Sequence, residues 1–190
     1  MKIHTFILAA SLLLPGVLRA GEQQKATFAA GCFWCMEAIY ERVPGVTNVV
    51  SGYTGGKEKD PTYKQVGSGK TGHCEAVEIT YDSEKTSYAK LLEVFWKSHD
   101  PTDGRGVAPD FGKQYRSALF YRTDEEKNTI EKSKAALEKQ LGKPVATQIA
   151  PFGKFYPAEA YHQDYVRNHP NDSYVRNVSI PRLIAAGFKE

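Results

Sequence analysis

The sequence predicts an α+β fold, with helices packed against a mixed β-sheet in a two-layer sandwich and a long irregular C-terminal tail. Short alternating stretches, typical of strands, interleave with stretches whose apolar residues recur every three or four positions, as in helices. The helices are too few and too unevenly spaced for a doubly wound parallel sheet. The 190 residues contain no repeat and no internal linker, so we expect a single domain over residues 21–190.

The first 20 residues predict a secretory signal peptide. A lysine at position 2 precedes an apolar run over residues 3–14, and residues 18–20 form an imperfect cleavage site. A permanent N-terminal anchor is the alternative, but the run is shorter than the roughly 20 residues that a membrane span needs. We therefore expect export, to the periplasm or the extracellular space, without stable membrane association.

A strand, a helix and a second strand are predicted first. Residues 25–30 predict a strand, and residues 31–43 have apolar side chains three or four apart, as in a helix. Pro44 and Gly45 end this helix. Residues 46–53 predict the second strand, which runs into a loop.

A long loop and a third strand follow. The loop over residues 52–72 holds six of the 16 glycines, and long ordered loops are usually functional. Residues 71–81 alternate with a period of two, which places Glu75 on the face of Val77 and Ile79 and Cys74 on the opposite face. A carboxyl group is unexpected on a face that should be packed.

The second half of the chain predicts two helices with recognisable starts. Asp82 begins a helix with an apolar stripe through Leu91 and Phe95. Thr123 and Glu126 form a capping box for a charged amphipathic helix that ends at residue 142. The other elements expected, in chain order, are a second long loop to residue 114, strands over residues 115–121 and 145–150, a short helix after residue 157 and an irregular tail after residue 168.

Charge excludes two classes of partner. The chain has 25 basic and 22 acidic residues, a formal charge of +3. Removing Lys2 and Arg19 with the signal segment leaves 23 against 22, or +1. This balance is not that of a protein that binds nucleic acid or a membrane surface.

Three cysteines, Cys32, Cys35 and Cys74, indicate reactive thiols rather than a disulfide framework, because an odd number leaves one over. Cys32 lies at the predicted strand-to-helix turn, where the N–H groups of a helix N-terminus favour a thiolate and should lower its pKa. We therefore interpret Cys32 as a nucleophile. The alternatives are a buried structural cysteine, a thioredoxin-type pair with Cys35, or half of a zinc site. A zinc site is not expected, because His73 and Cys74 are adjacent and point to opposite faces of a strand.

Two further features point to a reaction at Cys32. Phe33 and Trp34 lie on the first helical turn and suit a pocket for an apolar group. Glu75 on a packed face should be desolvated, which favours its protonated form. A neutral carboxylic acid can donate a proton to a substrate oxygen. The alternative is that Glu75 reaches solvent at the end of its strand.

Seven short motifs stand in a fixed order along the chain. They are Gly31-Cys32-Phe33-Trp34, Val49-Val50-Ser51-Gly52-Tyr53, Pro61-Thr62-Tyr63, Gly72-His73-Cys74-Glu75, His99-Asp100-Pro101, Gln114-Tyr115-Arg116-Ser117 and Tyr156-Pro157-Ala158-Glu159. In this order and spacing the chain resembles the A-class peptide methionine sulfoxide reductases (MsrA family). The resemblance covers nearly all of residues 25–170, and the set is far more specific than any single motif.

The resemblance implies a peptide-methionine (S)-S-oxide reductase that acts on free and protein-bound methionine S-sulfoxide and repairs proteins after oxidative damage. Cys32 would be the nucleophile and would become a sulfenic acid, a reversible oxidation state. Phe33 and Trp34 would hold the methyl group of the substrate. The family fold is a mixed-sheet α+β domain, and neither an organic cofactor nor a metal is implied.

The resemblance also assigns the residues around the sulfoxide oxygen. Glu75, Tyr63 and Tyr115 would bind this oxygen, and Glu75 would supply its proton. Asp110, five residues before Tyr115, would be the further acidic residue of the substrate site.

Two cysteines depart from the family pattern and bear on recycling. Cys35 stands where many relatives have glycine, Cys74 stands where alanine is usual, and no cysteine follows Cys74. The sulfenic acid could be resolved by Cys35, by Cys74 or directly by an external thiol, with a thioredoxin-like protein as the implied reductant. C-x-x-C redox proteins bridge a three-residue separation, whereas Cys74 points away from Glu75. We therefore expect a disulfide between Cys32 and Cys35.

Two other functions compete with this interpretation. A thiol–disulfide oxidoreductase would use Cys32 and Cys35, would reduce insulin and would not depend on Glu75. A non-enzymatic binding module with an aromatic pocket would keep its affinity and role when Cys32 is replaced.

Overall fold

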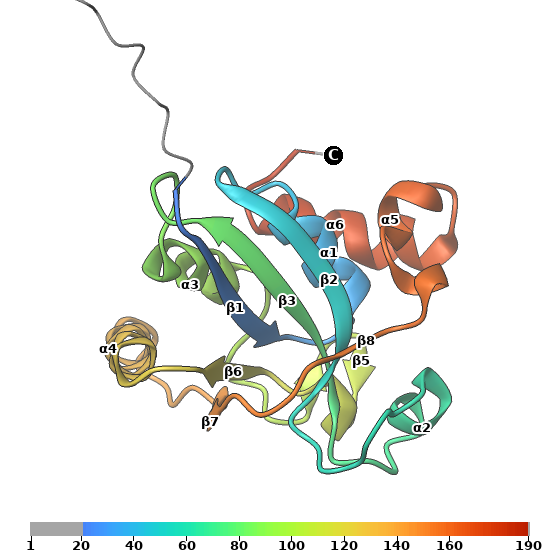
Figure 1. Cartoon of the computed structure of the whole chain (residues 1–190), viewed down its shortest axis with the longest axis horizontal. Coiled ribbons are helices and arrows are strands. Elements are labelled where there is room, and N and C mark those ends of the chain that lie inside the picture. Colours follow the sequence, from blue (N-terminus) through green and yellow to red (C-terminus); the bar gives the residue numbers. More distant parts are fainter. Residues whose placement is uncertain (1–20, 190) are drawn as a thin grey trace, which may run out of the picture.

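A six-stranded mixed sheet forms the centre of the computed structural model, which describes residues 21–189. The strands lie in the order β7-β6-β1-β3-β2-β8 (Figure 1), and all neighbours are antiparallel except β6 and β7. They are β1 (Gln23–Ala29), β2 (Val46–Thr54), β3 (Cys74–Asp82), β6 (Ala118–Tyr121), β7 (Gln148–Pro151) and β8 (Tyr156–Pro157). A separate hairpin pairs β4 (Gly106–Val107) with β5 (Asp110–Phe111). The predicted α+β fold is confirmed, and the signal-peptide prediction lies outside the described residues.

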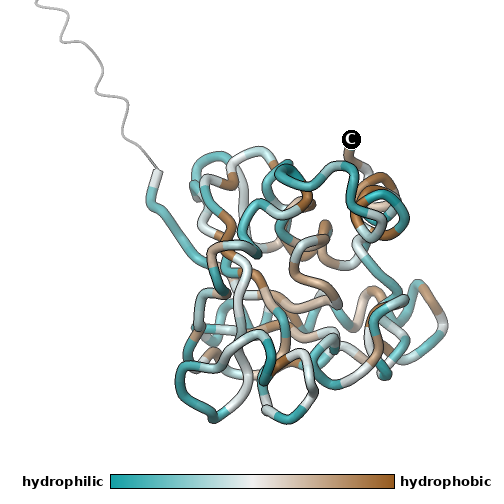
Figure 2. Tube along the Cα trace, turned by 90° about the vertical axis from the view of Figure 1, so that its right-hand side faces the viewer, coloured by the Kyte–Doolittle hydropathy of each residue, from teal (hydrophilic) through white to brown (hydrophobic). Residues whose placement is uncertain are grey.

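Two helices cover one face of the sheet and form its main hydrophobic core. The helices of the structure are α1 (Phe33–Tyr40), α2 (Tyr63–Gly67), α3 (Tyr88–Lys97), α4 (Asp124–Leu141), α5 (Tyr165–Asn168) and α6 (Ile180–Ala185). Buried side chains of α1 and α3 pack with Phe28, Val77 and Ile79 of the sheet. The Tyr40 hydroxyl donates to the Leu91 carbonyl at 3.0 Å and joins the two helices. Hydrophobic segments, brown in Figure 2, lie largely inside, and hydrophilic segments gather at the periphery.

The opposite face of the sheet is also buried. Cys74 and Ala76 of β3 lie in a second apolar cluster, against Phe152 and Phe155 of the segment that joins β7 to β8. This segment crosses the sheet in front of the central strands (Figure 1). A Cβ on Gly52 would stand 2.4 Å from the Phe155 ring, so glycine lets the segment lie this close. The alternation of β3 therefore separates two buried faces rather than a buried and an exposed one.

The turn between β1 and α1 requires glycine. Gly31 has φ 70°, in the left-handed region, and a Cβ there would lie 2.7 Å from Cβ of Val107. An L side chain would be strained in this conformation and would also clash. Cys32 follows as the N-cap residue of α1, at the position that the sequence predicts.

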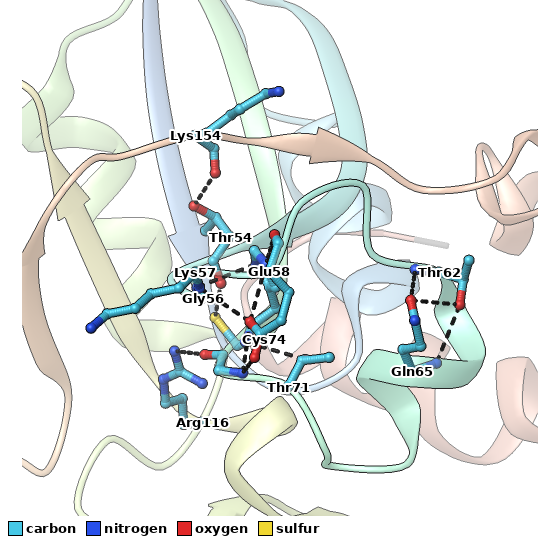
Figure 3. A network of polar contacts seen from close by, with 12 residues as sticks. Thr54, Gly56, Lys57, Glu58, Thr62, Gln65, Thr71, Cys74, Arg116 and Lys154 are labelled. Carbon is cyan, nitrogen blue, oxygen red and sulfur yellow. Dashed lines mark hydrogen bonds and ion pairs between the residues drawn. The ribbon is translucent and has the colours of Figure 1, made fainter.

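Polar contacts order the predicted long loop between β2 and β3 (Figure 3), together with Val66, which is buried in the main core. The Glu58 carboxylate accepts from the Gly72 N–H at 3.1 Å, and Arg116 donates to the Gly72 carbonyl at 3.0 Å. Thr62 and Gln65 form a reciprocal capping box that starts α2 inside the loop. These contacts fix the start of α2, and with it Tyr63.

The C-terminal prediction is wrong over residues 175–185. The chain there forms a π-helical turn, η3 (Val175–Ser179), which continues into α6. Val175 and Leu183 are buried against α1. Pro181 suggested irregular structure, but the π-helical turn directly before it continues into α6, with Pro181 as the second residue of that helix.

Three other boundaries differ from the prediction. Helix α3 begins at Tyr88 rather than Asp82, because Ser87 caps it and residues 82–86 form a turn. Tyr115 lies in a 3₁₀ turn, η1 (Lys113–Tyr115), ahead of β6. Tyr156 belongs to β8, and the short helix expected after residue 157 is split into the 3₁₀ turn η2 (Ala160–His162) and α5. Among the described residues, no helix has the length and apolar character that a membrane crossing needs.

Candidate active site

A cavity of about 140 Å³ opens at the N-terminal end of α1. Its lining residues are Cys32, Phe33, Trp34, Tyr63, Glu75, Asp110, Tyr115 and Tyr174. The structure thus brings together all the substrate and acid–base residues that the sequence proposes, and adds Tyr174. A larger hollow of about 540 Å³, between the starts of α3 and α4, contains no cysteine. The reactive side chains of the smaller cavity, rather than its volume, therefore identify it as the candidate site.

Glu75 is a buried carboxyl group at the start of β3. The residue is 2% exposed, and its Oε2 accepts a hydrogen bond from the Phe33 N–H at 3.1 Å. Burial raises the pKa of Glu75 to about 8 despite this hydrogen bond, and the nearby Asp110 adds to the shift. Glu75 therefore holds a proton at neutral pH and can donate it into the cavity.

The expectation of a lowered pKa at Cys32 is not met in the free protein. The first amide of α1, that of Phe33, donates to Glu75 rather than to the sulfur. Cys32 is 6% exposed, and burial raises its pKa well above the usual value; its hydrogen bond with Cys35 and the negative charges of Cys35 and Glu75 act in the same direction. The Cys32 thiol is therefore protonated before substrate binds.

Cys35 lies one helical turn further on and is fully buried. Its Sγ is 3.3 Å from the Ser179 Oγ. A hydrogen bond from Cys32 lowers the pKa of Cys35 to about 6, against the effect of burial, and Arg182 and Ser179 lower it further. In this pair of thiols, Cys35 is the one that carries the negative charge at neutral pH.

Cys74 is separated from the cavity by the sheet. Its sulfur is fully buried on the other face of β3 and lies 3.5 Å from the Thr54 carbonyl oxygen (Figure 3). Burial raises the pKa of Cys74 to about 11. Cys74 therefore lies on the face away from Glu75, as the alternation of the strand predicts.

Trp34 is held by an aromatic stack and one hydrogen bond. Its ring stacks on Tyr165 at a centroid distance of 3.6 Å and an interplanar angle of 4°. Its Nε1 donates to Nδ1 of His162 at 3.1 Å, so the proton of a neutral His162 is on Nε2. His162 is itself buried and packs against the rings of Phe33 and Tyr63.

Two tyrosines complete the polar side of the cavity. Burial raises the pKa of Tyr63 to about 12 and raises that of Tyr115, and the nearby Glu75 adds to both shifts. Both phenols are therefore hydrogen-bond donors at neutral pH. Glu159 fixes Tyr63, because its carboxylate accepts from the Tyr63 N–H at 2.9 Å and from the Tyr53 hydroxyl at 2.8 Å.

Tyr174 is the lining residue that the sequence does not indicate. Its hydroxyl donates a short hydrogen bond to Asp110, and its ring meets Trp34 edge to face. Tyr174 is one of 11 tyrosines and lies in the segment predicted to be irregular, so no sequence pattern distinguishes it. Within residues 21–189, no group of three or more His, Cys, Asp or Glu side chains could hold a metal ion.

Comparison with known proteins places this site in a family. The family model described as peptide methionine sulfoxide reductase matches residues 24–186. The chain is 51% identical to peptide methionine sulfoxide reductase MsrA 1 of Rhodopirellula baltica over 160 residues, which cover 84% of this chain and 83% of the relative. It is 53% identical to MsrA of Listeria innocua over 146 residues, 76% of this chain and 82% of the relative.

A solved structure of a relative has a similar fold. Reduced Mxr1 from Saccharomyces cerevisiae superimposes with a TM-score of 0.75 at 34% identity, covering 79% of this chain and 87% of Mxr1. The match of sequence and fold extends over the elements that carry the cavity. The chain therefore belongs to the MsrA class of the peptide methionine sulfoxide reductase family.

Proposed function

We propose that the cavity binds a methionine S-sulfoxide with its oxygen toward Glu75, Tyr63 and Tyr115 and its sulfur toward Cys32. The protein is a peptide-methionine (S)-S-oxide reductase that acts in repair after oxidative damage, as its family membership indicates. Phe33 and Trp34 supply the apolar wall for the methyl group, and Asp110 with Tyr174 closes the site beside them.

The residues supply the acid and the nucleophile that the reaction needs. A sulfoxide sulfur becomes electrophilic when its oxygen is hydrogen-bonded or protonated, and the neutral Glu75 can do this. Cys32 attacks the sulfur and forms a sulfur–sulfur bond with it. The oxygen then passes from the substrate sulfur to the Cys32 sulfur as the sulfur–sulfur bond breaks, and methionine leaves with the electron pair of that bond. Cys32 keeps the oxygen as a sulfenic acid, and the proton of its thiol ends on that oxygen. The substrate sulfur is reduced and the Cys32 sulfur is oxidised, so the electrons balance.

One observation carries this proposal: Cys32 and a protonated Glu75 line the same small cavity. A thiol–disulfide oxidoreductase has no use for a buried neutral carboxyl group beside its thiol. It also needs an attacking thiol that a protein disulfide can reach, whereas Cys32 is only 6% exposed and lines a small cavity. Sulfoxide reduction accounts for both features, and disulfide exchange with protein substrates accounts for neither.

Recycling proceeds through Cys35 in this proposal. Cys35 lies on the same helix as Cys32, whereas Cys74 is separated from both by the sheet. A Cys32–Cys35 disulfide needs a dithiol to reopen it, and a thioredoxin-like protein supplies one. The yeast relative Mxr1 has been solved in complex with Trx2.

Export is proposed on the sequence of the first 20 residues alone. The mature chain would begin at Gly21 and form one domain to residue 190, in the periplasm or outside the cell. Mass measurement of the protein recovered from the extracytoplasmic fraction would give its first residue. Recovery of the full-length chain with the cytoplasm would contradict the proposal.

The activity is tested by incubating the protein with dithiothreitol and a peptide that carries one epimer of methionine sulfoxide. We expect the S-epimer peptide to lose the mass of one oxygen atom and the R-epimer peptide to stay unchanged. The Cys32→Ser variant should leave both peptides unchanged. Insulin reduction without loss of oxygen from either peptide would instead support the disulfide-exchange function.

A further inference from the structure

Arg182 of α6 reaches the backbone that carries Cys32. Its Nη2 donates to the carbonyl of Ala30 at 3.0 Å, and both Nη2 and Nε donate to the carbonyl of Ser98 at 3.3 Å. Its Nη1 is buried and has no hydrogen-bond partner among residues 21–189. This atom lies 3.3 Å from the place that a Cβ on Gly31 would occupy. The guanidinium group is therefore fixed directly behind the turn into α1.

The positive charge of Arg182 has no carboxylate beside it. Arg182 forms no ion pair with a carboxylate in the part of the chain that the structure describes. Asp110 is the acidic residue of the cavity, and its carboxylate is already bonded to Tyr174. A partly buried cation without a counter-ion stabilises any anion that can form near it.

Cys35 is the group placed to provide this anion. Its Sγ is on the side of α1 that faces the C-terminal segment, 3.3 Å from the Ser179 Oγ. A serine hydroxyl can donate to a thiolate. Ser179 and Arg182 are three residues apart, so one segment brings a hydroxyl group into contact with the Cys35 sulfur and a positive charge near enough to lower the pKa of Cys35. The Arg182 Nη2 itself lies 3.8 Å from the sulfur of Met36, the next residue of α1.

We propose that Ser179 and Arg182 hold Cys35 as a thiolate and thereby promote the recycling of Cys32 after each turnover. Neither residue lines the substrate cavity, so both are positioning residues that act through Cys35. The inference rests on the proposed function, because it concerns the step that follows formation of the sulfenic acid.

The recycling step balances with groups already present. The Cys35 thiolate attacks the sulfur of the Cys32 sulfenic acid, the sulfur–sulfur bond forms, and the sulfur–oxygen bond breaks. The leaving hydroxide takes the proton of Glu75 and departs as water. The Cys35 sulfur is oxidised as the Cys32 sulfur is reduced, so no outside oxidant is needed. The thioredoxin-like dithiol then restores both thiols.

The groups around Cys35 act on it in opposite directions. The hydrogen bond from Cys32 and the charge of Arg182 lower the pKa of Cys35, whereas burial and the charge of Asp110 raise it, and the result is about 6. The titratable groups that face the pair of thiols are Asp110, Glu75 and Tyr174. Of these, Glu75 and Tyr174 are neutral at neutral pH. The charges that act on Cys35 are therefore the positive charge of Arg182, which lowers its pKa, and the negative charge of Asp110, which raises it.

A thiolate titration tests the inference. In a Cys74→Ala background, ultraviolet absorbance should report one thiolate that forms with a midpoint near pH 6. The signal should disappear in Cys35→Ser. Arg182→Met should raise the midpoint by about one pH unit or more, and Arg182→Lys, which keeps the charge, should stay nearer the wild type. Arg176→Met removes an equal charge from an exposed position of the same segment and should leave the midpoint unchanged.

A single-turnover experiment separates this inference from the function on which it rests. The protein reacts with one equivalent of sulfoxide peptide without reductant, and methionine release and disulfide formation are followed in the same samples. In Arg182→Met, the pH at which disulfide formation reaches half its maximal rate should rise together with the thiolate midpoint. Absence of methionine release from the wild-type protein would refute the proposed function instead.

Three results would overturn the inference. They are a thiolate signal that persists in Cys35→Ser, a midpoint in Arg182→Met equal to that of the wild type, and a wild-type midpoint above about pH 8. If circular dichroism shows that Arg182→Met does not fold, Arg182→Gln replaces it, since glutamine keeps two donors without the charge. Ser179→Ala should shift the midpoint in the same direction by a smaller amount.

Discussion

At the scale of single residues, protonation decides what the cavity can do. Glu75 remains neutral because desolvation outweighs the hydrogen bond that it accepts from Phe33. Cys32 also remains neutral, so the free protein holds both protons of the reaction at neutral pH. Attack by Cys32 requires loss of its thiol proton, which ends on the oxygen of the sulfenic acid.

The first prediction concerns Glu75. Glu75→Gln keeps a hydrogen-bond donor but cannot give up a proton, so the single-turnover rate of methionine release should fall roughly a hundredfold. The wild-type rate should decline above about pH 8 as Glu75 ionises, and this decline should be absent in the variant. Glu78→Gln on the same strand is the control, because its carboxylate pairs with Lys25 and Arg122 instead. An unchanged rate in Glu75→Gln would show that Glu75 is only a strand residue.

The sequence predicted which residues belong to the site better than it predicted their protonation states. The alternation of β3 placed Glu75 on a buried face and Cys74 on the other, because a period of two fixes the side of a strand without knowledge of the fold. The pKa of Cys32 was predicted in the wrong direction. Its value depends first on burial, which the fold decides, and then on neighbours that include Glu75. Glu75 lies 43 residues away in sequence and takes the first amide of the helix.

At the scale of elements, the C-terminal segment formed by η3 and α6 packs against α1. Residues of η3 and α6 pack against Ala38 and Ile39 of α1, and Ser179 reaches Cys35. The segment was predicted to be irregular because Pro170 and Pro181 were interpreted as breaks. Its helices are too short to show a clear period, and the surface that orders them is made by α1, far away in sequence.

The second prediction tests this packing. Leu183 is buried against α1, whereas its neighbour Ile184 is 56% exposed. Leu183→Ala should lower the free energy of unfolding by about 2–4 kcal/mol, because it leaves a cavity. Ile184→Ala should change it by less than about 0.5 kcal/mol. Equal effects in denaturant titrations of the two variants would contradict the placement of α6.

The third prediction concerns Glu37 of α1. This carboxyl group is buried, accepts from the Asp164 N–H at 3.0 Å and leaves Oε1 without a partner among residues 21–189. Burial raises its pKa to about 7 in the folded protein, above the unfolded value of about 4.3. The stability that it contributes is therefore complete below about pH 4 and is lost as the pH rises through 7.

Replacement of Glu37 by glutamine removes this loss. At pH 8 the melting temperature of Glu37→Gln should exceed that of the wild type by a few degrees, and the two should converge near pH 4. Glu131→Gln, at an exposed position of α4, is the control and should follow the wild type at both values of pH. A lower melting temperature of Glu37→Gln at pH 8 would show that the charged form is the stabilising one.

At the scale of the whole molecule, the sheet divides the three cysteines into two groups. Cys32 and Cys35 belong to the core that α1 and α3 form, and Cys74 belongs to the cluster beneath the segment joining β7 to β8. The mixed sheet with helices packed on it was predictable from the sequence, because periodicity reports which residues are buried. The second buried face was not, because the covering segment begins 70 residues after the end of β3.

This division gives the fourth prediction. After one turnover without reductant, peptide mapping with alkylation of free thiols should find a Cys32–Cys35 disulfide and an alkylated Cys74. The Cys74→Ala variant should form the same disulfide. A Cys32–Cys74 bridge, or a persistent sulfenic acid with Cys35 alkylated, would exclude Cys35 as the resolving thiol and leave the reductase function in place.

Attack by Cys32 on the sulfoxide is tested most directly by methionine release in a single turnover without reductant. The wild-type protein and Cys35→Ser should each release one methionine per protein molecule, because Cys35 acts only after the oxygen has been transferred. Cys32→Ser should release none. Full release by Cys32→Ser, or none by the wild-type protein, would contradict the assignment of Cys32 as the nucleophile.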